Sequence, residues 1–188
     1  LSQRAVQLMA APRPSLLARL RGDVRGVSAV EFALLAPVLI AFYFGLAEFC
    51  QGYMAQKRMG HASAVVADLV AQSDSIRSSQ MTDMFKVGDL VMKPFSSSPL
   101  KQRASSLTRD TFGVVRVDWS QGSGMAARSN GSTVSIPDGL IEKGESVIMT
   151  EVTYDYDSPV DYLMPSVTRF SQTYYLRPRT VDRITYSN

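Results

Sequence analysis

Residues 25–50, RGVSAVEFALLAPVLIAFYFGLAEFC, decide the fold of this chain. No charged residue occurs from position 32 to position 47, and the apolar block of residues 27–49 covers 23 positions. As an α-helix, this block would be about 34 Å long, which is enough to cross a bilayer whose hydrocarbon core is about 30 Å thick. We therefore expect a membrane-spanning helix.

Glu31 is the one charged residue close to the start of this helix. A charged side chain at the centre of a membrane helix costs about 2.5–3.5 kcal/mol, and less near the helix end. Two interpretations of Glu31 are open. It lies in the headgroup layer, where the first helical turn favours a negative charge, or it has a function that outweighs its solvation cost.

The segment before the helix is basic. Residues 1–26 carry five arginines against the single Asp23, a charge of +4, while the whole chain of 188 residues carries only +3. These arginines are Arg4, Arg13, Arg19, Arg21 and Arg25. Basic residues beside an apolar helix stay on the cytoplasmic side, so we expect the C-terminal part to lie across the membrane. The nearly neutral remainder gives no reason to expect a nucleic-acid partner.

The order Gly26, then VSAV, then Glu31 and Phe32 resembles the class III signal of type IV pilins and pseudopilins. With Pro37 and the GLAEF run of residues 45–49, it is similar to the TadE-like family of the tight-adherence (Flp-type) pilus system. The resemblance implies that a prepilin peptidase cuts after Gly26 and makes Val27 the mature N-terminus. It also implies that Glu31 assists processing or pairs with the terminal amine of a neighbouring subunit.

The same resemblance implies a non-enzymatic minor pilin or pseudopilin of the bacterial inner membrane, single-pass, with a cytoplasmic N-terminus and a periplasmic head. Its implied partners are the prepilin peptidase, the major pilin, sibling pseudopilins, the Tad assembly platform and inner-membrane lipid. The order WS at residues 119–120, IPDGL at 136–140 and EVTYDY at 151–156 is more loosely similar to this family.

Three other interpretations compete with this one. A secretory signal peptide would have a small-residue cleavage site, for which Gly45 and Ala47 are candidates, but Glu48 and the length of the block argue against it. A mitochondrial presequence is also rich in arginine and poor in acids. The remaining alternative is an uncleaved membrane-anchored module whose extracytoplasmic head binds a ligand.

We expect three parts: the leader of residues 1–26, a helix within residues 27–72, and a head of residues 73–188. Apolar residues recur with helical spacing beyond the membrane at Ala62, Val65, Val66, Leu69 and Val70. The first helix should therefore continue from about residue 28 to residue 71, with its second half packed on the head. We also expect a bend near Pro37.

The head should be α+β, with a small antiparallel sheet covered by the long helix, as in a pilin. A polar break at residues 73–79 precedes a second helix that ends before Pro94. Extended segments are expected at residues 112–119, 134–137, 146–157 and 169–177, giving three or four antiparallel strands. We place one core on the side chains of Val115, Val117, Trp119, Val152 and Tyr154.

No catalytic, phosphate-binding or metal-ligand motif is present in the sequence, so we expect no enzymatic activity, cofactor or metal. His61 is the only histidine, expected on the helix surface or beside the sheet, and Cys50 is the only cysteine, expected to be inert. The acidic group of Glu151, Asp155, Asp157 and Asp161 could hold calcium. Strand alternation instead places Glu151 and Asp155 on a solvent-facing surface of the strand, which favours solvated side chains over a calcium site.

Overall fold

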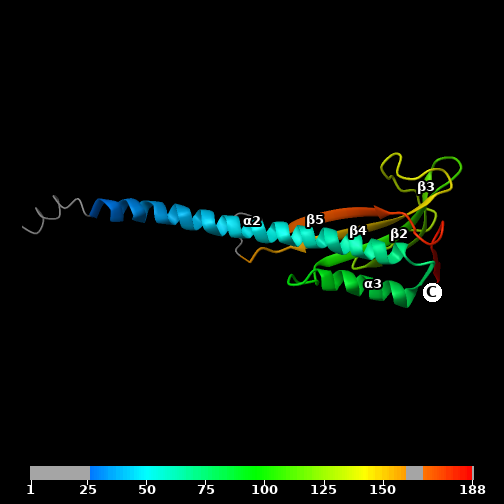
Figure 1. Ribbon diagram of the computed structural model, residues 1–188, viewed down its shortest axis with the longest axis horizontal. Coiled ribbons are helices and arrows are strands. Elements are labelled where there is room, and N and C mark those ends of the chain that lie inside the picture. Colours follow the sequence, from blue (N-terminus) through cyan, green and yellow to red (C-terminus); the bar gives the residue numbers. More distant parts are fainter. Residues whose placement is uncertain (1–25, 160–166, 188) are drawn as a thin grey trace, which may run out of the picture. The chain divides into compact units, whose positions relative to one another are not determined.

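The computed structural model describes residues 26–159 and 167–187. It confirms the predicted α+β class, since a long helix precedes a head that contains a four-stranded antiparallel sheet (Figure 1). The chain divides after Tyr43 into two compact units. The helices are α2 (Val27–Ala71) and α3 (Ser78–Val91), and the strands are β1 (Ser75–Arg77), β2 (Leu100–Arg109), β3 (Val115–Ser123), β4 (Ser146–Tyr156), β5 (Thr168–Leu176) and β6 (Thr185–Ser187).

Helix α2 confirms the predicted helix of residues 28–71 to within one residue. Pro37 lies inside it, and the helix continues on both sides of the proline. Proline removes one backbone hydrogen bond from a helix. Membrane helices tolerate this loss, because local adjustments and neighbouring groups satisfy the freed carbonyl. The bend expected at Pro37 stays a prediction.

The second half of α2 packs on the sheet through small side chains. Its buried residues include Ala55, Met59, Ala62, Ser63, Val66, Ala67, Val70 and Ala71. Val65 and Leu69, predicted on the buried face, are only half-buried. The Ser63 hydroxyl lies 3.0 Å from Oγ1 of Thr150 on β4, and Thr150 Oγ1 donates to the Ser63 carbonyl at 3.1 Å. The centre of the buried face therefore follows Ser63 and Val66, and Val65 and Leu69 lie on its flank.

The sheet has the order β3-β2-β4-β5, and its central strand β2 is not predicted by the sequence. The reason is that β2 buries polar side chains instead of alternating apolar ones: Gln102, Ser105, Ser106 and Thr108. Their side chains form hydrogen bonds within the head; for example, the hydroxyls of Ser105 and Ser120 lie 2.9 Å apart. Residues 134–137, predicted as extended, form no strand; their neighbour Thr133 makes a single bridge to Arg116.

The structure also tests the predicted second helix and the predicted polar break before it. The predicted second helix is present as α3 and ends before Pro94. The predicted polar break at residues 73–79 instead contains strand β1 and the first turn of α3. Strands predicted at residues 146–157 and 169–177 are present as β4 and β5.

The single predicted core is wrong, because a β-bulge divides its members between two faces of the sheet. Ser106 pairs with Trp119, whereas the next residue Leu107 pairs with Val117, so Asp118 is the extra residue. Trp119 consequently packs with the helices, while Val117 packs on the opposite face. The Asp118 carboxylate accepts hydrogen bonds from Ser106 at 3.2 Å and Thr108 at 2.6 Å.

The described residues form three apolar clusters. The first joins α2, α3 and the sheet around Trp119 and Ile148. The second lies at the other end of the helical face and contains Val152 and Tyr154. The third, on the opposite face, contains Val115, Val117 and Met149.

The C-terminal segment closes the first cluster. Strand β6 pairs in parallel with β1, and Ile184 before it is fully buried. The indole Nε1 of Trp119 donates to the Ile184 carbonyl at 2.8 Å, and the Tyr186 ring stacks on Trp119 with centroids 5.6 Å apart. The backbone N–H of Arg179 donates to the Ala71 carbonyl at 2.9 Å, which satisfies one of the carbonyls that lack an intrahelical partner at the end of α2.

Candidate functional site

The predicted processing residues lie at the first turns of α2. Gly26 directly precedes the helix, and among the described residues, its chain neighbours aside, no atom lies within 4 Å of the position that a Cβ on Gly26 would take. Val27 is the first residue of α2, and both residues are exposed. The peptide bond between them is therefore accessible at the boundary where the helix begins.

Glu31 and Phe32 follow on the exposed surface of the helix, and the Phe32 side chain is 67% exposed. Within the described residues, no partner binds the Glu31 carboxylate. Their neighbours are also exposed apolar side chains: Val30, Leu34, Leu35, Val38, Leu39, Ile40, Phe42 and Tyr43. Gly26, Val27, Glu31 and Phe32 thus lie at one end of a helix surface that the described residues leave uncovered.

This surface suits a bilayer despite Glu31. Helix α2 is long and apolar enough to cross a membrane, and its most apolar stretch is not buried in the described structure. Residues 27–49 include twelve Leu, Ile, Phe and Val. Each of these contributes about −0.3 to −0.6 kcal/mol to insertion, or about −4 to −7 kcal/mol together. This is comparable with the cost of the two carboxylates in the block, Glu31 and Glu48, each of which costs about 2.5–3.5 kcal/mol at the membrane centre and less near a helix end.

Glu48 is a candidate that sequence reasoning did not single out. Its side chain is fully buried, on the same face of α2 as Gly45, Gly52 and Ala55. Burial raises the pKa of the nearby Tyr156 phenol, and the negative charge of Glu48 raises it further. The regular spacing of small residues around Glu48 was the available signal, because it indicates a face that the rest of the protein approaches closely.

The acidic side chains of Glu151 and Asp155 on β4 form ion pairs with arginines. Burial alone would raise the pKa of Glu151, but hydrogen bonds from Arg103 and Arg128 lower it. Arg128 Nη2 lies 2.7 Å from the Glu151 carboxylate. Arg169 likewise lowers the pKa of Asp155. The predicted solvated face is therefore an ion-paired one. Among the described residues no group of three acidic, His or Cys side chains could hold a metal ion, and Asp161 lies outside them.

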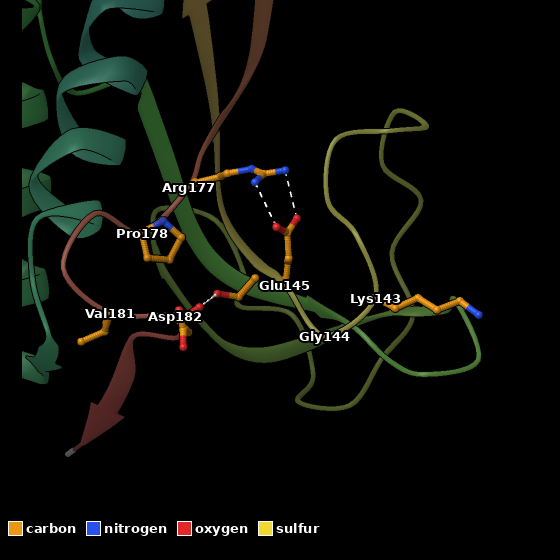
Figure 2. A pocket seen from close by; sticks show the side chains of 8 residues that line it. Lys143, Gly144, Glu145, Arg177, Pro178, Val181 and Asp182 are labelled. Atoms are coloured by element: carbon orange, nitrogen blue, oxygen red, sulfur yellow. Dashed lines mark hydrogen bonds and ion pairs between the residues drawn. The ribbon is translucent and has the colours of Figure 1, made fainter.

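A cavity of about 430 Å³ lies between the start of β4 and the segment after β5. Figure 2 shows Arg177 and Glu145 pointing toward each other, 3.0 Å apart, with Lys143 directed away from this pair. The Ser146 hydroxyl donates to the Asp182 carbonyl. The ion pair uses Arg177 and Glu145, the hydrogen bond uses Ser146, and neither aligns a nucleophile with a base. His61 lies elsewhere, exposed on α2 as predicted, and Cys50 is also exposed.

Comparison with known proteins finds a similarity in the N-terminal part of the chain. Residues 26–68 match the model of the family described as TadE-like protein. The match begins at Gly26 and includes Glu31, Phe32 and Glu48. No curated protein and no solved structure matches the chain. The looser resemblance of the strand region lies beyond the matched residues.

Proposed function

We propose, from the match of residues 26–68 to the TadE-like family, that this Tad-pilus-associated protein is a minor pilin or pseudopilin. It acts as a non-enzymatic structural or assembly subunit. The observation that carries the proposal is the order of Gly26, Val27, Glu31 and Phe32 at the start of an exposed helix long enough to span a membrane.

The basic leader sets the orientation in this proposal. Five arginines before the helix stay in the cytoplasm, so residues 1–26 remain inside and the head is periplasmic, anchored in the bacterial inner membrane. The prepilin peptidase then cuts after Gly26. The absence of a side chain at Gly26 lets the backbone approach a protease at the membrane face, whereas a Cβ would obstruct that approach.

Glu31 has the second role. After cleavage, Val27 carries a new ammonium group. Glu31 either pairs with the corresponding amine of a neighbouring subunit or assists the processing step. A bilayer strengthens such a pair because neither charge has water to return to. The proposed partners are the major pilin, sibling pseudopilins and the Tad assembly platform.

Cleavage provides the decisive experiment. In cells that contain the prepilin peptidase, the unaltered protein should begin at Val27 by N-terminal sequencing or intact mass, whereas Gly26→Val should remain uncut. Ala29→Val is a matched control, since it adds similar bulk within the helix and should be processed. Glu31→Ala should still insert, because the helix becomes more apolar, but pilus assembly should fall.

The opposite outcome is equally clear. A mature protein that retains Arg25 and Gly26 beside an active peptidase would refute the pilin proposal. The uncleaved anchored binding module would then take its place.

A further inference from the structure

Two adjoining cavities form one groove in the head, which we call the α2–β5 groove. Their volumes are about 570 and 380 Å³, and both are lined by Tyr174 of β5. The wall on α2 is one flank of the helix, because its residues recur at helical spacing. They are Tyr53, Gln56, Lys57, Gly60, His61, Ala64, Val65, Asp68 and Leu69. The other wall is formed by Gln172, Tyr174 and Leu176.

The groove exists because the helices do not cover the whole sheet. The hydrogen bond between Ser63 and Thr150 holds α2 over β4, and α3 contacts β3. β5 is an edge strand, and its residues Gln172 and Tyr174 face the helical side but remain exposed. In the described part of the chain, no helix lies beside α2 over β5.

The shape of the groove fits a second helix. Helices pack with their axes about 8–10 Å apart, and small residues permit the closest approach. In the middle of the groove, no atom lies within 4 Å of the position that a Cβ on Gly60 would take, and Ala64 follows one turn later. A strand added to the free edge of β5 would leave the α2 wall of the groove uncovered.

Charge indicates the chemistry of the occupant. Lys57 lies over the Tyr53 ring, 5.3 Å from its centroid, and binds no carboxylate among the described residues. At the other end of the groove, Asp68 is neutralised by Arg179, and Val65, Leu69 and Leu176 provide apolar walls. A complementary helix would carry an acidic residue opposite Lys57 and apolar residues beyond it.

We propose that the α2–β5 groove binds an amphipathic helix of a different membrane-anchored protein, parallel to α2, with an Asp or Glu opposite Lys57. This inference rests on the proposed function, in which both proteins enter the groove from the same membrane. Parallel packing in register with a second copy of this chain would place Lys57 opposite Lys57, and like charges at facing positions repel.

Photo-crosslinking of the full-length protein in its native membrane tests the groove. With His61 replaced by p-benzoylphenylalanine, we expect an adduct whose partner peptide directly follows a membrane-spanning segment and contains Asp or Glu. Gly60→Leu should reduce the adduct about tenfold, because overpacking a fitted interface is unfavourable. Lys57→Glu should reduce it about two- to fivefold.

Ser79→Leu is the matched control, since it adds an exposed leucine to α3 outside the groove, and the adduct should persist. Gly60→Leu should not unfold the head, because its side chain enters open space and leucine favours helix. An adduct with a second copy, an adduct with an extended segment, no adduct, or no effect of Gly60→Leu would each overturn the inference. Cleavage at Gly26, measured on the same samples, reports separately on the proposed function.

Discussion

Gly88→Ala should destabilise the head even though alanine favours helix formation. Gly88 is buried in α3, and a Cβ there would lie 2.1 Å from Oε1 of Gln102 and 3.0 Å from Cγ2 of Val66. The Gln102 amide cannot move without loss, because its Nε2 donates to the Phe85 carbonyl at 3.0 Å and to the Asp89 carboxylate at 2.9 Å.

The expected magnitude follows from these contacts. Replacing glycine by alanine in a helix gains about 1 kcal/mol. Displacing the Gln102 amide loses one neutral hydrogen bond, about 1 kcal/mol, and one charged hydrogen bond, about 1.5–3 kcal/mol. The net destabilisation is about 1.5–3 kcal/mol, which lowers the Tm of a domain of this size by about 6–12 °C.

Thermal and urea unfolding of a head fragment beginning at Gln56 would measure this loss. We expect the fragment to be soluble and to show mixed helix and sheet by circular dichroism. Gly60→Ala is the matched control, because its Cβ meets no atom, and it should be neutral or slightly stabilising. Gly88→Ala should cost less when Gln102 is already alanine, apart from the contact with Val66. A Gly88→Ala variant as stable as Gly60→Ala would refute the packing argument.

Three other outcomes are expected. A periplasmic reporter fused after Asn188 should be active and a cytoplasmic one inactive; the reverse would exclude both the pilin and the uncleaved anchor. Trp119→Phe should cost about 1 kcal/mol and speed hydrogen exchange at residues 185–187, because the Ile184 carbonyl loses its donor; unchanged exchange would contradict this role. The folded pKa of Glu151 lies below its ordinary value of 4.5, so its contribution to stability is present above pH 4.5 and is lost as the pH falls through the folded pKa. Glu151→Gln should flatten this acid dependence in urea titrations, and an unchanged slope would show that other groups cause it.

The sequence by itself determined the features that depend on local pattern. An uncharged apolar run specifies α2, because a helix that satisfies its own backbone is what a bilayer accepts. Alternating side chains specify β4 and β5, whose cross-strand pairs recur with a period of two. The order of Gly26, Glu31 and Phe32 likewise identified the candidate processing site without any structural information.

Only the tertiary structure decided the rest. Strand β2 has no apolar alternation. The buried amide nitrogen of Gln102 and the buried hydroxyls of its serine neighbours bind partners on other elements, which the sequence pattern does not reveal. The bulge at Asp118 reverses the faces of a strand whose sequence pattern is regular. The burial of Glu48 and the open flank of Gly60 depend on where α2 lies over the sheet. Helical periodicity identifies a buried face, but the neighbouring elements determine its centre and which flank stays open.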